Sequence, residues 1–319
     1  MKKRLILIIG LFLLLLPVSL LLAYGYNSSQ HADYGWGVRL TGRTYIESHP
    51  RVVIDRAHHN AHTARGKYHP FATLIDMDGC DVKSGKRSFS AKSLEKVDVL
   101  VIVNASGGGH PTLMGINVPL VGGKDNRAAV AFTPEEIEAV RAWVEKGGSL
   151  LLIADHAPYG SSSEPMAAAF GVTMHKGFTE IPNEVSDPME FSRDNGRLPD
   201  HPIVAGSGED TRVTRVLTFT GQSLDGPPGA TMLLALPDSA VEYVPPAGDR
   251  EGPVEMREEP AGAAQGLAFD YGAGRVVVLG EAAMLTAQVY RGEKFGMNTP
   301  GCDNQQFALN IVHWLTREL

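Results

Sequence analysis

The chain has 319 residues, enough for one large domain or two small ones, and 43% of them are hydrophobic, which is enough for a sizeable core. Its net charge is −7, its pI is about 5.9, and no basic stripe is present, so the composition excludes nucleic acid as the expected partner. No repeat with a period of about 20 to 50 residues occurs, which excludes repeat architectures.

The N-terminus carries a targeting segment. Lys2, Lys3 and Arg4 precede an apolar run over 5–23, which would span roughly 28 Å as a helix, close to the roughly 30 Å hydrocarbon core of a membrane. This length favours an uncleaved anchor, whereas the small residues around Ala23 favour a cleaved signal peptide. Both alternatives place the body outside the cytoplasm, periplasmic or extracellular, with residues 5–23 at the cytoplasmic or inner membrane.

After this anchor or signal peptide (1–23), the polar, Gly-rich residues 24–50 are predicted to form a linker. Residues 51–319 are predicted to form one α/β domain that contains a β-rich insertion over 171–274.

Strand and helix patterns alternate in the first part of this domain. Buried strands are predicted at 51–55, 97–103 and 149–154, with a weak strand at 81–82 or 88–89. Helices are predicted from Pro70 to Gly79, over 90–96, from the cap Thr133 to Gly147, and over 164–170. The alternation predicts a flavodoxin-like, doubly wound parallel sheet of about five strands, with an antiparallel extension at one edge.

The later part of the chain has a different pattern. Strands are predicted at 213–219 and 231–236, and a β-hairpin over 265–279. The Pro- and Glu-rich residues 245–262 predict a mobile loop. Asp303 is expected to cap a final helix that runs to about Thr316.

Polar clusters follow several of the predicted strands. In an open α/β sheet the ligand binds beyond the carboxyl ends of the strands, so these clusters are expected to converge in one pocket. The residues concerned are Asp55, His58, His59, Asn60, Asp155, His156 and Glu281.

The first of these clusters has metal-ligating potential. His58, His59 and His62 lie beside Asp55, and imidazole and carboxylate are ordinary zinc ligands. A divalent cation such as zinc is therefore a candidate cofactor. The alternative is that one or two of these histidines are hydrogen-bonded structural residues, since the zinc-helix motif with its internal glutamate is absent.

Asp55 and the carboxylates after later strands are candidates for catalytic acid–base chemistry. Asp155 and His156 could supply a general base and its partner, or Asp155 could instead cap the next turn. Glu281 could be catalytic, or could be an acid favoured by the positive end of a helix dipole. Asn60, Asn104 and Ser106 are candidate ligand-binding residues, the last two within a Gly-rich loop that could form an anion nest or an ordinary flexible connection.

The two cysteines, Cys80 and Cys302, are placed by the predicted topology near opposite edges of the sheet, which argues against a disulfide between them. No G-x-G-x-x-G follows the first strand and no phosphate-loop lysine motif occurs, so nicotinamide, flavin and nucleotide chemistry are not expected.

Three motifs carry a family resemblance. They are Ile54-Asp55-x-x-His58-x-Asn60-x-His62-Thr63, the run Gly147 to His156, and Gly274 to Glu281. Together they resemble an uncharacterised family of exported bacterial proteins, a domain of unknown function similar in fold to class I glutamine amidotransferases. The resemblance covers roughly residues 50–318 and implies a flavodoxin-like sheet, but no known activity.

True amidotransferases of this class carry a cysteine on a sharp turn after a central strand. The stretch here is Val103-Asn104-Ala105-Ser106-Gly107, without cysteine, so thiol-dependent glutamine hydrolysis is not expected. Two functions remain open: a hydrolase, with or without a metal ion, and a non-catalytic module of the cell envelope that binds a sugar or a peptide.

Overall fold

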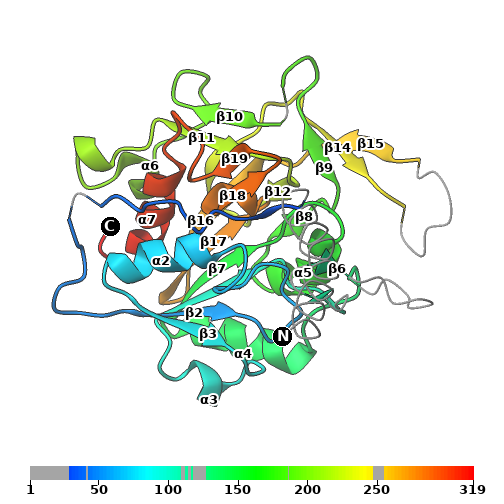
Figure 1. Cartoon of the computed structure of the whole chain (residues 1–319). Helices are drawn as coiled ribbons and strands as arrows, with labels where there is room; N and C mark the ends of the chain where they lie inside the picture. The colour runs from blue at the N-terminus through cyan, green and yellow to red at the C-terminus, as the bar shows by residue number, and fades with distance from the viewer. Residues whose placement is uncertain are drawn as a thin grey trace, which may run out of the picture.

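The computed structural model describes residues 29–40, 42–108, 112–113, 116–117, 127–185, 187–246 and 255–319 (Figure 1). The predicted anchor or signal peptide, residues 1–23, lies outside these ranges. Within them, no helix has both the length and the apolar character needed to span a membrane.

Five parallel strands form one side of a nine-stranded sheet. They are β2 (Arg51–Asp55), β3 (Asp81–Gly85), β4 (Val99–Val103), β7 (Ser149–Ile153) and β17 (Gly274–Leu279), in the order β3-β2-β4-β7-β17. Counted along the chain, this is the order 2-1-3-4-5 of flavodoxin-like sheets. The predicted parallel sheet is therefore confirmed, and the weak second strand is the segment that begins at Asp81.

Antiparallel strands extend the sheet beyond β17, as predicted. β16 (Ala264–Tyr271) forms a hairpin with β17, and the outer edge comprises β13 (Thr231–Ala235), β12 (Leu224–Asp225) and β8 (Thr173–Met174). These strands come from the predicted β-rich insertion and the hairpin that follows it.

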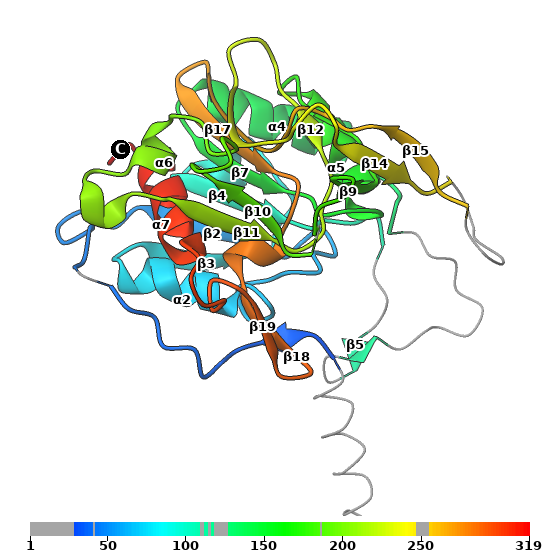
Figure 2. The same cartoon turned by 90° about the horizontal axis from the view of Figure 1, so that it is seen from above.

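Helices cover both faces of the sheet, as Figure 2 shows. One face packs against α2 (His69–Met77) and α7 (Asn304–Leu315), and the other against α3 (Ala91–Leu94), α4 (Pro134–Glu145) and α5 (Tyr159–Ala168). Successive strand residues point to opposite faces, so Val101 packs against the first pair of helices and Ile102 packs on the other side.

Local sequence signals set several helix ends. Thr133 and Glu136 form a reciprocal capping box at the start of α4, as the sequence predicts for Thr133. Gly79 follows α2 with a φ of 113°, and a Cβ there would lie 2.1 Å from the carbonyl oxygen of Tyr45, so only glycine fits.

Two predictions about local structure are wrong. Asp303 does not cap α7 with its side chain, because Oδ2 accepts hydrogen bonds from the backbone N–H groups of Thr214 and Arg215. Part of the predicted loop over 245–262 is a strand, β15 (Arg257–Pro260), which pairs with β14 (Val241–Val244). Its charged side chains suit an exposed sheet edge.

The described part of the predicted linker contacts the domain. β1 (His31–Ala32) pairs with β18 (Ala287–Tyr290), which pairs in turn with β19 (Glu293–Gly296). Tyr45 is buried in the core, where its hydroxyl lies 2.5 Å from Thr316 Oγ1.

The remaining elements are short. They are β5 (Thr112–Leu113), β6 (Ile116–Asn117), β9 (Phe178–Glu180), β10 (Met189–Ser192), α6 (Pro202–Ala205), η1 (Glu209–Thr211), β11 (Arg215–Thr218) and η2 (Ala283–Leu285).

Candidate functional site

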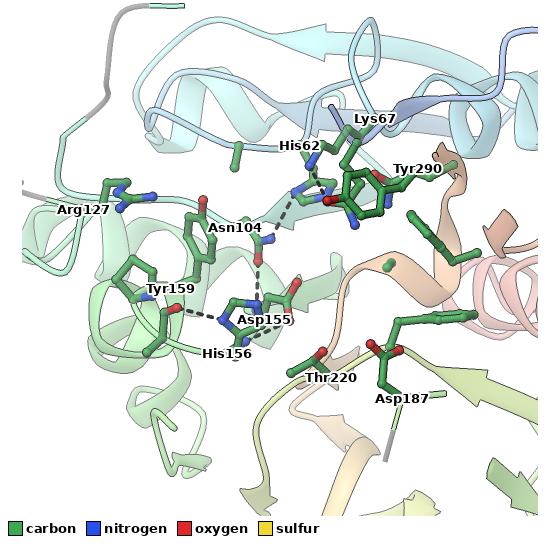
Figure 3. A pocket seen from close by; sticks show the side chains of 18 of the residues that line it. His62, Lys67, Asn104, Arg127, Asp155, His156, Tyr159, Asp187, Thr220 and Tyr290 are labelled. Carbon is green, nitrogen blue, oxygen red and sulfur yellow. Dashed lines mark hydrogen bonds between the residues drawn. The ribbon is translucent and has the colours of Figure 1, made fainter. Parts of the chain in front are cut away.

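A polar cavity of about 710 Å³ lies at the carboxyl end of the parallel strands. His62 and Lys67 reach it from the loop after β2, Asn104 follows β4, and Asp155 and His156 follow β7 (Figure 3). The sheet topology therefore brings together four predicted site residues, namely His62, Asn104, Asp155 and His156.

Asn104 connects two of these groups. Its Oδ1 accepts the backbone N–H of Asp155 at 2.8 Å, and its Nδ2 lies 3.0 Å from Nδ1 of His62. Because Oδ1 must face an N–H donor, Nδ2 faces His62 and donates to Nδ1. The His62 proton is therefore on Nε2. Figure 3 shows His62, Asn104 and Asp155 in one hydrogen-bonded row.

The backbone of Asn104 is in the left-handed region, with a φ of 46°. Asparagine tolerates this conformation better than most residues with a side chain, because its short polar group can bond locally. The position is fully buried, so a sharp turn after β4 holds the amide in place between the two groups it bonds.

His62 is a neutral hydrogen-bond donor toward the cavity. Burial lowers its pKa well below the usual range, and the nearby Lys67 lowers it further. No protein acceptor bonds Nε2 within the described ranges. The Nε2–H group is therefore available to an oxygen atom of a ligand.

Replacing Asn104 with aspartate tests this tautomer. A carboxylate would still accept the Asp155 N–H, but it would place an oxygen against Nδ1 of His62, so protonation of the ring becomes favourable. We expect the pKa of His62 to rise, whereas the wild-type ring stays neutral and protonated at Nε2. Nitrogen chemical shifts of the histidine ring across a pH titration report both properties, and an Nδ1–H signal in the wild type would contradict the assignment.

Asp155 is one of two carboxylates that line the cavity, with Asp187. The residue is 9% exposed, and Oδ1 accepts the backbone N–H of the adjacent His156, whereas α5 begins after Pro158 without a side-chain cap. The carboxyl group lines the cavity beside the side chain of Asn104, which also bonds it. Burial raises the pKa of Asp155, while the nearby His156 and Lys67 offset part of the rise.

Lys67 and His156 border this carboxylate. Lys67 Nζ donates to Gln30 Oε1 at 3.0 Å, and burial lowers its pKa, partly opposed by the negative charge of Asp155. The ring of His156 stacks on Phe178 with a centroid distance of 4.5 Å, and its Nδ1 lies 2.8 Å from the carbonyl oxygen of Ala157. The cavity thus combines the carboxylates of Asp155 and Asp187 with several nitrogen donors.

Glu281 lies close to this site but does not line the cavity. Its two carboxyl oxygens accept the N–H groups of Ala283 and Met284, at 2.6 and 2.7 Å, and so cap η2. Burial and the charge of Asp155 raise its pKa well above the usual range. The sequence left open a catalytic role and a role at the positive end of a helix. The bonds to Ala283 and Met284 place Glu281 at the start of the short helix η2.

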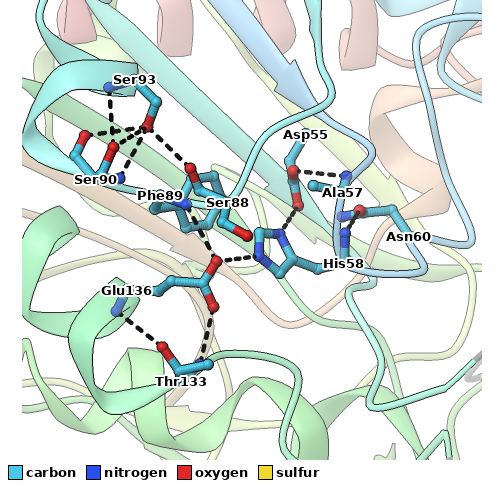
Figure 4. A network of polar contacts seen from close by, with 10 residues as sticks. All are labelled: Asp55, Ala57, His58, Asn60, Ser88, Phe89, Ser90, Ser93, Thr133 and Glu136. Atoms are coloured by element: carbon cyan, nitrogen blue, oxygen red, sulfur yellow. Dashed lines mark hydrogen bonds and ion pairs between the residues drawn. The ribbon is translucent and has the colours of Figure 1, made fainter.

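Asp55 and His58 belong to a separate buried network (Figure 4). His58 Nδ1 lies 2.8 Å from Asp55 Oδ2, and its Nε2 lies 2.9 Å from Glu136 Oε1. The rings of Phe89 and Phe132 pack on the imidazole. Since two carboxylates hold both ring nitrogens in a closed aromatic pocket, this network stabilises the packing of the first loop on α4.

Of the three other predicted residues, two position loops and one is exposed. Asn60 Nδ2 donates to the carbonyl of Val103, Ser106 Oγ donates to the carbonyl of His59, and the His59 side chain is exposed. Ser106 is 2% exposed and does not line the cavity, which gives it no access to a ligand there.

The predicted metal ligands do not fit a common ion. The nitrogens of His58 are occupied by carboxylates, His62 faces Asn104, and His59 points to solvent. Among the described residues, no group of three or more His, Cys, Asp and Glu side chains is arranged to hold a metal. Cys80 and Cys302 are both free thiols and neither lines the cavity.

Sequence reasoning missed several lining residues. Lys67 lies in the same loop as the histidines, which is a signal that could have identified it. Asp187 and Tyr290 come from segments without a predicted strand end, so only the tertiary structure places them here, whereas Thr220 directly follows the predicted strand 213–219.

Comparisons with known proteins support the fold alone. No protein-family model and no curated protein matches the chain. The mmIFT52 N-terminal domain is similar to it with a TM-score of 0.56 at 11% identity, over 83% of this chain and 97% of that domain.

Two looser likenesses have TM-scores too low to carry an argument. A GMP synthase-like protein from Thermoplasma acidophilum gives a TM-score of 0.43 at 9% identity, over 86% of this chain and 97% of its own. A ThuA-like protein from Parabacteroides merdae gives a TM-score of 0.45 at 13% identity, over 85% of this chain and 91% of its own.

Proposed function

We propose that the protein is an exported hydrolase with an amidotransferase-like fold that lacks the cysteine nucleophile. The observation that carries the proposal is the buried carboxyl group of Asp155, which lines a polar cavity together with the neutral donor His62. A carboxylate with a raised pKa is a stronger base than an ordinary one, and perturbed groups gathered in a cleft are typical of active sites.

The residues support direct attack by water. Asp155 would accept a proton from a water molecule as that water attacks the carbonyl carbon of an ester or an amide. The protonated Asp155 would then give this proton to the leaving alcohol or amine as its C–O or C–N bond breaks. The Nε2–H of His62 and the amino group of Lys67 would donate hydrogen bonds to the oxygen that becomes negative. Asn104 holds Asp155 and His62 in place, because it hydrogen-bonds both residues.

A second candidate function has its own support. No serine or cysteine lines the cavity among the described residues, so neither of the commonest hydrolase nucleophiles faces it. This favours a binding module of the cell envelope, in which the same donors and Asp155 hold a sugar or a peptide without chemistry.

A substrate panel separates the two candidates. The full chain is incubated with small esters, amides and glycosides, and product release is followed at pH 5 to 9. The hydrolase proposal expects turnover of at least one ester or amide class. Saturable binding of panel members without any product would overturn the hydrolase and leave the binding module.

Export is part of the same proposal. The basic residues before the apolar run support it, as does the length of that run. We expect the chain in the membrane fraction or outside the cytoplasm, with the body accessible to an added protease after removal of the outer layers of the cell. Recovery in the cytoplasmic fraction would contradict this expectation.

A further inference from the structure

A second hollow adjoins the cavity. Its volume is about 250 Å³, and Phe178 of β9 and Tyr243 of β14 line it together with Met256. Thr220 and Asp187 line both the hollow and the cavity, so the two spaces meet at these residues. Figure 3 shows both residues on the same side of the cavity.

The two spaces differ in chemistry. Carboxylate and nitrogen groups dominate the cavity, whereas two aromatic rings and a thioether provide the main surface of the hollow. The wall between them is also shared, because the His156 ring in the cavity stacks on the Phe178 ring in the hollow. A single ligand could therefore place a polar group in one and an apolar group in the other.

Backbone strain marks the junction independently. Thr220 has a φ of 72°, which is rare for a β-branched residue and is kept only where the surrounding structure enforces it. Such outliers cluster at ligand sites. Here the strained residue lies at the boundary that a two-part ligand would cross.

We propose that the hollow holds an uncharged aromatic or short aliphatic group attached to the ester or amide bound in the cavity. This inference rests on the proposed function and names its substrate class. Asp187 and Glu180 border the hollow, and these carboxylates disfavour an anionic group there. The volume suits one ring or a short chain.

Three matched amides test the proposal: acetamide, benzamide and 4-carboxybenzamide. The full chain is labelled with ¹³C at its methionine methyl groups, and Met256→Leu identifies the Met256 signal. We expect benzamide to shift this signal saturably, with a Kd at least tenfold lower than that of acetamide, because it buries an apolar ring. The anionic 4-carboxybenzamide is expected to bind at least fivefold more weakly than benzamide.

Tyr243→Ala should raise the Kd of benzamide at least fivefold. Tyr271→Ala, which removes a tyrosine packed on Phe170 outside both spaces, should not. No Met256 response, or equal affinities for acetamide and benzamide, would overturn the inference. Hydrolysis without that response would overturn it and keep the proposed function, whereas the response without hydrolysis would support the binding of an apolar group and overturn catalysis.

Discussion

Asp155→Asn is expected to lower kcat/KM for the hydrolysed panel member by roughly 100-fold or more, since a general base contributes about that much to catalysis. The asparagine oxygen can still accept the His156 N–H, so the local turn is preserved. The amide of asparagine is not basic at either its oxygen or its nitrogen, so the variant cannot take a proton from water. Steady-state hydrolysis measures kcat/KM, and circular dichroism checks that the variant is folded.

The pH profile gives a further test of the same residue. The base must be ionised, so the rate should rise with pH and level off above the pKa of Asp155, which burial raises above that of an ordinary aspartate. Asp238→Asn serves as the control, because Asp238 is exposed and outside the cavity. An Asp155→Asn variant with nearly full activity would rule out the proposed base.

His58→Ala is expected to lower the free energy of unfolding by on the order of 3 kcal/mol, because it leaves Asp55 and Glu136 buried without their shared partner. The loss of the ring also leaves a space between Phe89 and Phe132. Urea unfolding at fixed pH measures the change. A loss below about 1 kcal/mol would show that the network does not stabilise the fold.

The loss of stability caused by His58→Ala should depend on pH. Burial lowers the pKa of His58, but the hydrogen bonds and charges of Asp55 and Glu136 outweigh it and raise the pKa above the usual value. Stabilisation from this rise is fully present below the unfolded pKa of about 6.5 and is lost as pH rises through the folded pKa. The wild type and the variant should therefore differ more at pH 6 than at pH 9.

His59→Asn is the matched control for His58→Ala. The two histidines are adjacent, but His59 is exposed and has a φ of 47°, a conformation that asparagine tolerates. Its effect on stability is expected to stay within about 0.5 kcal/mol. A loss as large as that of His58→Ala would point to a disturbed loop rather than to the buried charges.

The sequence was sufficient to predict the central sheet. Apolar runs such as 99–103 and 149–153 are buried on both faces, so their composition alone identifies parallel strands. Thr133 and Glu136 predict the start of α4 because a capping box is a local interaction. The order of the parallel strands then follows from the few topologies that right-handed crossovers allow.

The surroundings of each polar side chain could not be predicted from the sequence. Asp55 and Asp155 both follow buried strands, yet Asp55 bonds His58 inside a closed network while Asp155 faces the cavity. The difference depends on Glu136, which lies far away in the chain and meets His58 only after α4 packs on the sheet. A polar motif at a strand end therefore predicts that its residues lie at the carboxyl edge of the sheet, but not whether a side chain faces the cavity or a buried network.

The chain by itself determined which segments reach the carboxyl edge, because strand burial and helix caps depend on neighbouring residues. Only the tertiary structure decided which residues share the cavity. Thr220, Asp187 and Lys67 meet Asp155 through the packing of the insertion and the first loop on the sheet, and such long-range contacts leave no periodic signal in the sequence. The physical reason is that backbone patterns are local, whereas a binding site is made by contacts between distant segments.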